Sequence, residues 1–190
     1  METERQKALR DFVTKMHGAQ KRKYTGEPYV NHCFEVGKYA EANGIQYGLE
    51  IGFSHDLIED TECTLPQLLD FLLNTGYDNI EAMTITFAVS DLTDVFTHED
   101  YPKLNRKKRK NLECGRLGTI DPISQSVKYC DIINNTKSIC KHDPKFAKTY
   151  LKEIDNILTH MKKGNAEIFQ YCRDQVRTEL ILSENDSSSK

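Results

Sequence analysis

Four ionisable side chains stand close together in an otherwise apolar segment, at His55, Asp56, Glu59 and Asp60. His55 and Asp56 are adjacent and offer a nitrogen and an oxygen ligand to one cation. On a helix, Glu59 shares their face, and Asp60 follows Asp56 at a spacing of four. An ordinary helix end with scattered charges is the plain alternative. The residue types and their spacing favour a metal-dependent phosphohydrolase site.

Two residues from other segments could complete the ligand set. His32 lies near the start of one expected helix, and Asp131 lies in the middle of another, beside apolar neighbours. A carboxylate in such a helix costs roughly several kcal/mol unless it is paired or coordinated. A buried salt bridge or an exposed position would explain Asp131 equally well. If the helices face one another, their ligands meet in a bundle core and suit manganese, iron or zinc.

Apolar residues recur at helical spacing through most of the chain. They predict helices over residues 4–21, 29–43, 48–60, 64–73, 78–89, 102–114, 123–140, 146–161 and 166–182. Residues 78–89 would also suit a strand, and residues 90–102 read as a loop. Because we find no internal repeat and no run of alternating strands, we predict an all-α helical bundle. Its length suits one domain over residues 1–182, followed by a disordered polar tail over residues 183–190.

The composition points to a cytoplasmic protein. Hydrophobic residues make up 38% and charged residues 29% of the chain. Its apolar runs are far shorter than the roughly 20 residues that cross a bilayer, and the charged start lacks a signal-peptide core. The six cysteines form no CxxC pair, so reduced thiols are expected.

Positive charge is concentrated in two segments although the net charge is only -3. These are Lys21–Lys23 and Lys103–Lys110. Either segment could hold phosphate groups, and either could instead be a solvated helix face.

Three ordered patterns carry a family resemblance. They are H-x-x-Q-x-R-x-x-x-G-x-P-Y-x-x-H over residues 17–32, H-D-x-x-E-D-T over residues 55–61 and V-K-x-x-D-x-x-x-N over residues 127–135. Together they resemble the hydrolase domains of RelA/SpoT-type alarmone enzymes, which have the HD-domain helical fold. We find no room for a synthetase domain, so the chain is most similar to the stand-alone small alarmone hydrolases, including the metazoan SpoT homologue.

The resemblance implies a manganese-dependent guanosine-3′,5′-bis(diphosphate) 3′-pyrophosphohydrolase. One Mn²⁺ per chain would be held by His32, His55, Asp56 and Asp131. The ion would lower the pKa of bound water from about 15.7 toward about 7. Glu59 would orient or deprotonate that water, and Asp60 would assist by hydrogen bonding or proton transfer. Pyrophosphate would be released from (p)ppGpp, leaving GDP or GTP.

The same resemblance supplies candidate substrate contacts. They are Arg22, Lys23, Lys103, Arg106, Lys107, Asn135, Lys148 and Tyr150. His17 either braces the site from behind the ligands or packs against the following helix.

Two alternatives remain open at this stage. The same metal site could act on an adenosine alarmone or on the 2′-phosphate of NADPH. The chain could instead be a non-catalytic basic module that binds nucleotides or nucleic acid, although no basic surface interleaved with aromatic residues supports nucleic acid. We therefore expect a small nucleotide substrate, no membrane partner and no nucleic acid, and we leave the oligomeric state open.

Overall fold

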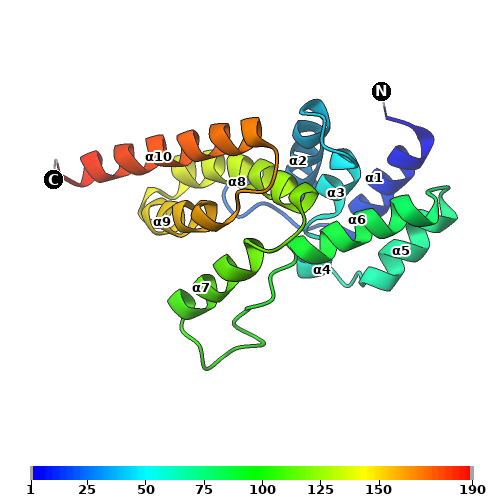
Figure 1. Ribbon diagram of the computed structural model, residues 1–190, viewed down its shortest axis with the longest axis horizontal. Helices are drawn as coiled ribbons and strands as arrows, with labels where there is room; N and C mark the ends of the chain where they lie inside the picture. The colour runs from blue at the N-terminus through cyan, green and yellow to red at the C-terminus, as the bar shows by residue number, and fades with distance from the viewer. Residues whose placement is uncertain (1, 189–190) are drawn as a thin grey trace. The chain divides into compact units, whose positions relative to one another are not determined.

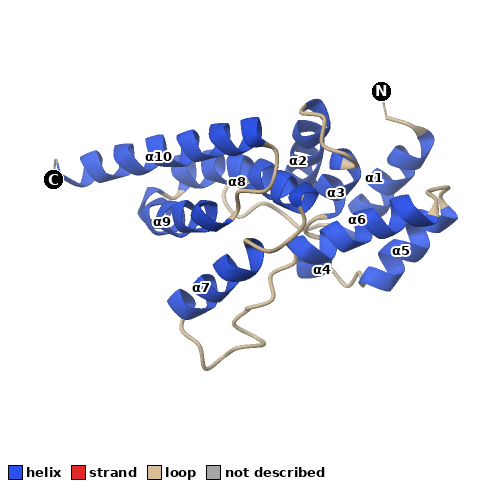
Figure 2. Cartoon of the chain, viewed as in Figure 1, coloured by secondary structure: helices blue, strands red, loops and turns tan. Residues whose placement is uncertain are grey.

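The computed structural model describes residues 2–188 as helices joined by turns and loops, with no β-strand among them (Figure 1). Figure 2 shows the same helices by secondary structure. This confirms the predicted all-α class. Within these residues no helix is both long and apolar enough to cross a membrane. The chain divides into two compact units, Met1–Thr93 and Asp94–Lys190.

The first unit contains the helices α1 (Glu4–His17), α2 (Val30–Ala42), α3 (Gly48–Ser54), α4 (Leu57–Asp60), α5 (Leu65–Asn74) and α6 (Asn79–Leu92). Three of them begin with a capping box, in which the N-cap side chain and the side chain at the third helical position each bond the other's backbone. The boxes join Thr3 with Gln6, Thr64 with Gln67, and Asp78 with Glu81. Thr64 was predicted as the N-cap of α5, and the structure confirms it.

Residues 79–92 form a helix, so the strand alternative for this segment is wrong. The hydroxyl of Thr84 donates a hydrogen bond to the carbonyl of Ile80 at 2.7 Å. A β-branched threonine can be held in a helix in this way, because its hydroxyl bonds the preceding turn. The capping box at Asp78 fixes the start of α6.

The core of the first unit forms where α2 and α3 pack against each other. Val36 and Ala40 of α2 and Ile51 and Phe53 of α3 are fully buried. Burying a side chain such as Phe53 stabilises the fold by about 1.5–3 kcal/mol. Because a short turn joins the two helices, they run antiparallel, and the start of α2 lies beside the end of α3.

The second unit contains α7 (Arg106–Leu117), α8 (Pro122–His142), α9 (Pro144–His160) and α10 (Ala166–Ser188). Side chains of Asn105, Asp121 and Asp143 cap the first three of these helices by accepting backbone N–H bonds. α8, α9 and α10 pack together. Tyr129 and Leu151 are fully buried between them.

Several helix boundaries differ from the sequence prediction. α1 ends at His17 rather than at residue 21. α7 begins at Arg106 rather than at residue 102, because Asn105 provides its N-cap. α10 continues to Ser188, beyond the predicted end at residue 182. Residues 189–190 of the predicted tail lie outside the described residues. That residues 1–182 make one HD-type domain stays a prediction.

Candidate metal centre

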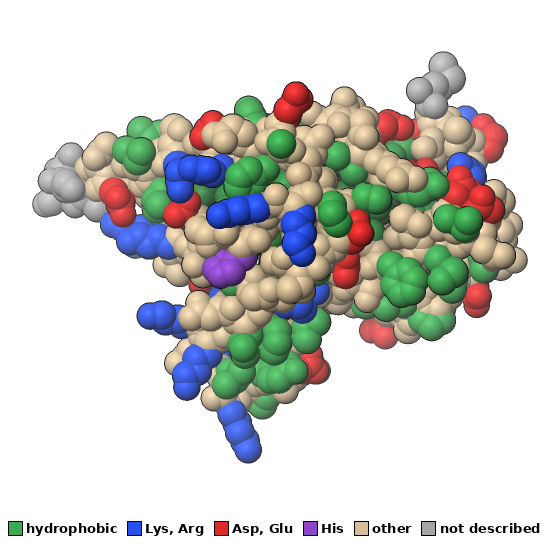
Figure 3. Space-filling view, viewed as in Figure 1, with side chains coloured by type: hydrophobic (Ala, Val, Ile, Leu, Met, Phe, Trp, Pro, Cys, Tyr) green, Lys and Arg blue, Asp and Glu red, His purple; other side chains and the backbone are tan. Residues whose placement is uncertain are grey.

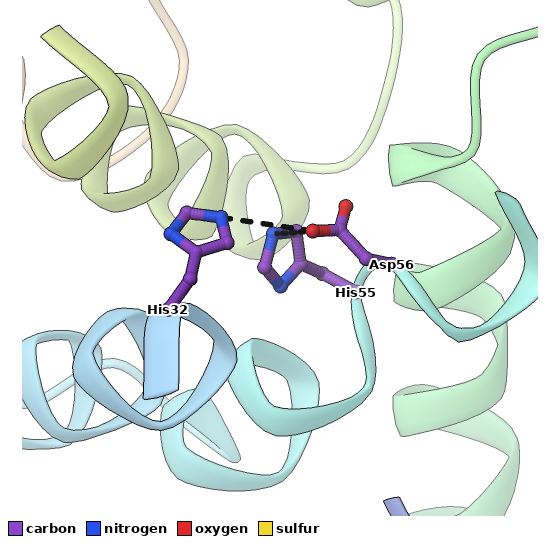
Figure 4. A group of neighbouring side chains, drawn as sticks. All are labelled: His32, His55 and Asp56. Carbon is purple, nitrogen blue, oxygen red and sulfur yellow. Dashed lines mark ion pairs between the residues drawn. The ribbon is translucent and has the colours of Figure 1, made fainter. Parts of the chain in front are cut away.

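Two histidine rings and one carboxylate converge in the first unit. His32 in α2 and His55 after α3 are buried, and Asp56 is partly exposed. The Nε2 atoms of His32 and His55 lie 3.6 and 3.1 Å from Oδ2 of Asp56, as Figure 4 shows. Ligand atoms of the three residues lie within 4.8 Å of one another. Three donors are therefore presented to one point.

The donor spacing fits a first-row divalent ion. Two atoms that each lie about 2.1 Å from an ion, at tetrahedral or octahedral angles, are roughly 3.0–3.4 Å apart. The two distances from Nε2 to Oδ2, 3.6 and 3.1 Å, are close to this range. Imidazole with carboxylate suits manganese, iron or zinc. Three protein ligands also leave coordination positions for further ligands.

A backbone carbonyl selects the tautomer of the His55 ring. Nδ1 of His55 lies 2.8 Å from the carbonyl oxygen of Gly52. Because a carbonyl can only accept, Nδ1 of the neutral ring donates its proton there and Nε2 presents its lone pair. Second contacts of this kind orient most histidines that bind metals.

The predicted continuous helix over residues 48–60 is wrong at the site itself. α3 ends at Ser54 and α4 begins at Leu57, with Asp56 at φ -98° and ψ 1° between them. On a straight helix, neighbouring side chains point about 100° apart, which would separate His55 from Asp56. The turn lets both side chains aim at the same point. Active-site residues are often found in this sparsely populated backbone region.

Tyr29 orients the Asp56 carboxylate. Its hydroxyl donates a hydrogen bond to Oδ2 of Asp56 at 2.7 Å. Its ring stacks on that of buried His17, with the centroids 5.3 Å apart, and meets His32 edge-on at 5.8 Å. His17 also lies 3.9 Å from Sγ of Cys33 in α2, so it takes part in both roles left open for it, bracing Tyr29 and packing against the following helix.

Sequence reasoning gave Tyr29 no role, because tyrosine was not among the expected ligands. The available signal was its position three residues before His32, at the start of the same helix. The contribution of Gly37 and Gly52, which let α2 and α3 approach closely, was also missed. Two glycines inside helical segments were the signal, because glycine there usually marks close packing.

The two predicted catalytic carboxylates, Glu59 and Asp60, end α4 and are exposed. The backbone N–H of Asp60 donates to the carbonyl of Asp56 at 2.9 Å. The hydroxyl of Thr61 closes the turn by donating to the carbonyl of Leu57 at 2.6 Å. Both carboxylates therefore lie in the turn that directly follows His55 and Asp56, and both reach solvent.

Asp131 lies in α8 of the second unit and is buried. Its Oδ2 is 3.0 Å from Nζ of Lys128, and its Oδ1 accepts a hydrogen bond from Asn135 at 2.6 Å. Burial raises the pKa of nearby Tyr150, and the negative charge of Asp131 raises it further, so this phenol stays neutral. Lys128 and Asn135, both in the same helix as Asp131, thus each contact one oxygen of its carboxylate.

Arg22 and Lys23 lie in the loop between α1 and α2. The loop is a small closed turn, in which the Arg22 N–H donates to the carbonyl of Glu27 at 2.9 Å. Lys23 is exposed and lies over the ring of Tyr24, 5.0 Å from its centroid. This loop leads into Tyr29 and lies in the same unit as the cluster of His32, His55 and Asp56.

The remaining substrate candidates lie in the second unit. Arg106 forms a bidentate ion pair with Glu153, in which its Nε and Nη2 atoms donate to the two carboxylate oxygens at 2.8 and 2.7 Å. Lys103 and Lys107 are exposed, and Lys148 in α9 is partly buried. Arg106 is thus held by a carboxylate, whereas Lys103 and Lys107 extend into solvent.

Comparison with known proteins identifies a structural relative. No family model matches the chain, and no curated protein matches it significantly. A solved structure of a metazoan SpoT ortholog, described as hydrolysing ppGpp and having a role in starvation responses, matches with a TM-score of 0.73 and 18% sequence identity. The match covers 93% of this chain and 95% of that one. The chain has the fold of that SpoT ortholog.

The shared SpoT-ortholog fold confirms the helical architecture that the three sequence patterns implied. Because the match covers 93% of the chain, it includes residues of both compact units. The converging His32, His55 and Asp56 thus occur in a fold that a described ppGpp hydrolase also has.

Proposed function

We propose that the chain is a metal-dependent hydrolase of guanosine 3′,5′-bis(diphosphate) that releases the 3′ pyrophosphate. The observation that carries this proposal is the convergence of His32, His55 and Asp56 around one point, in a fold shared with a ppGpp hydrolase. We also propose that the protein acts in the cytoplasm.

The proposed metal is manganese, with His32, His55 and Asp56 as ligands and Asp131 as the fourth. The position of Asp131 in the V-K-x-x-D-x-x-x-N pattern supports its inclusion. When bound, a divalent ion makes water acidic enough to attack near neutral pH and offsets charge on phosphate oxygens. Tyr29 and the Gly52 carbonyl hold Asp56 and His55 in orientation for this task.

Glu59 is the proposed general base. It accepts a proton from the attacking water as the new P–O bond forms, and the bond between that phosphorus and the ribose 3′ oxygen breaks. The 3′ oxygen leaves with a proton, so the products are pyrophosphate and GDP, or GTP where the substrate carries a 5′ triphosphate. Asp60 assists by hydrogen bonding or by returning a proton. Their exposure supports these roles, because both carboxylates must reach water and substrate.

Positively charged residues are proposed to hold the phosphates. Arg22 and Lys23 would contact the nucleotide from the loop before Tyr29, and Lys103, Lys107 and Lys148 would meet the diphosphates. Tyr150 stays neutral and can therefore donate a hydrogen bond. Arg106 contacts Glu153 and Asn135 contacts Asp131. We propose that these two residues support substrate binding by positioning those carboxylates.

The test is to incubate the manganese-loaded protein with guanosine 3′,5′-bis(diphosphate), its adenosine counterpart and NADPH, and to identify the products by chromatography. We expect GDP and pyrophosphate from the guanosine compound. Release of single phosphate from NADPH alone, or cleavage of the adenosine compound alone, would replace the proposed substrate. Asp56→Asn is the control and should lose both bound metal and turnover. No hydrolysis of any compound would favour the non-catalytic alternative.

A further inference from the structure

A small cavity lies between α9 and α10 in the second unit. It measures about 140 Å³ and is lined by residues of α9, of α10 and of the connection between them. At roughly 30 Å³ per water, it has room for four or five waters, which is enough to admit one phosphate group. None of its lining residues is a proposed metal ligand, catalytic residue or substrate contact.

The charge of the cavity lining is mainly positive. Lys162, Arg173 and Arg177 contribute three cations, against the single carboxylate of Asp155. Asp155 accepts a hydrogen bond from Nε of Arg177 at 3.3 Å and thereby holds that side chain. Figure 3 shows Lys and Arg side chains gathered over α9 and α10 on the face in view. The cavity thus keeps a surplus of positive charge after the internal pair is formed.

Arg173 is the most informative residue of this cavity. Its side chain is partly buried, and its Nε atom is buried without a hydrogen-bond partner among residues 2–188. A buried charged donor that lacks a partner is costly, because it has lost its hydrogen bonds to water without replacement. A guanidinium presents its N–H groups as a planar fork that matches two oxygens of one phosphate or carboxylate.

We propose that this cavity binds a phosphoryl dianion. Arg173 donates through its planar fork, while Lys162 and Arg177 supply charge from either side. Thr159 also lines the cavity, but its hydroxyl already donates to the carbonyl of Asn156 at 2.7 Å, so the donors to the ligand come from the three cations. The ligand is either free orthophosphate or the phosphate end of a small monoester whose remainder extends into solvent. This proposal does not depend on the proposed hydrolase activity.

The probe is orthophosphate, titrated into the full chain without added metal at constant ionic strength. The signal is the Nε–H resonance of Arg173, assigned by its loss in Arg173→Gln. We expect this resonance to shift and saturate. A parallel titration with glycerol 3-phosphate distinguishes the two possible ligands. Tighter binding of glycerol 3-phosphate indicates a monoester, and tighter binding of orthophosphate indicates free phosphate. Acetate at the same ionic strength should bind more weakly than either.

Two neighbouring lysines provide the matched control. Lys162 lines the cavity, whereas Lys163 does not. We expect Lys162→Gln to weaken phosphate binding about tenfold and Lys163→Gln to leave it unchanged. Equal effects of the two changes, or a shift that chloride alone reproduces, would overturn the proposal. If Arg173→Gln fails to fold, the comparison of the two lysine variants by calorimetry decides the question.

Discussion

Gly37 of α2 and Gly52 of α3 meet backbone to backbone. A Cβ atom added to Gly52 would lie 2.4 Å from Cα of Gly37, and one added to Gly37 would lie 2.6 Å from the carbonyl oxygen of Leu49. Both distances are too short for any side chain. This contact sets the separation of the two helices that carry His32 and lead into His55.

Gly52→Ala should therefore force the helices apart. We expect the free energy of unfolding to fall by about 2–3 kcal/mol, together with a loss of metal affinity, because a shift of the backbone at residue 52 also displaces the carbonyl that holds the ring of His55. Urea denaturation and manganese titration measure the two effects. Gly115→Ala is the matched control, because a Cβ there meets nothing within 4 Å. It should stabilise α7 by about 0.5–1 kcal/mol. The interpretation fails if the two variants behave alike.

Tyr29→Phe should weaken metal binding without removing a ligand. The variant keeps the stacked ring but loses the hydroxyl that donates to Asp56. Loss of such an orienting contact typically costs about tenfold in metal affinity. Calorimetric titration with manganese measures this. Tyr77→Phe removes a hydroxyl that donates to Glu50 at 3.3 Å, and it should leave the affinity unchanged. Equal affinities of Tyr29→Phe and the parent protein would remove Tyr29 from the site.

Local signals in the sequence were sufficient to predict most of the helices. Thr64 with Pro66, and Asp121 with Pro122, mark helix starts through side-chain capping and the fixed φ of proline. The end of α10 was harder to place, because its last residues are polar and carry no apolar stripe. Capping chemistry is local and can be read from neighbouring residues.

The sequence predicted which side chains would lie together better than it predicted their geometry. His32, His55 and Asp56 were all expected, and they lie together. The break between α3 and α4 was not expected, because the apolar spacing continues across it, and the contact between His55 and the Gly52 carbonyl at the break is not revealed by spacing either. The pairing of Arg106 with Glu153 could not be predicted either, since 47 residues separate them. Contacts of this range are set by helix packing.

Glu59→Gln should separate metal binding from turnover. The amide cannot accept the proton, so we expect turnover to fall by about 10²–10⁴-fold while manganese affinity stays close to that of the parent. Steady-state kinetics and metal titration on the same preparation test this. Glu62→Gln, a change at a nearby exposed acid, should leave both unchanged. Near-normal turnover of Glu59→Gln would show that another group takes the proton.

Lys107→Ala should mainly change KM, whereas Arg106→Ala should mainly change stability. Lys107 is exposed, so its removal should raise KM about three- to tenfold with little change in stability. Arg106 is held by Glu153 and lies over the ring of Phe146. Its removal should cost about 0.5 kcal/mol of stability and change KM less. Kinetics and thermal denaturation of both variants measure this, and an unchanged KM for Lys107→Ala would leave that lysine as part of a solvated helix face.

The stability of the second unit should fall at high pH through Tyr129. This residue is fully buried, and its hydroxyl donates to the carbonyl of Met161 at 2.8 Å. Burial raises the pKa of Tyr129 from 10.0 to about 12. Because the folded state holds this proton more tightly than the unfolded chain, the contribution is complete below pH 10 and is lost as the pH rises through about 12.

Tyr129→Phe tests this assignment. The variant loses the hydrogen bond and should start about 1 kcal/mol below the parent protein at neutral pH. Since it has no phenol to ionise, the gap in unfolding free energy should shrink between pH 10 and pH 12, the range set by the raised pKa. Urea denaturation at several pH values measures the gap. Tyr171→Phe, at a half-exposed position, should follow the parent throughout. A gap for Tyr129→Phe that stays constant would mean that the buried phenol does not drive the alkaline loss.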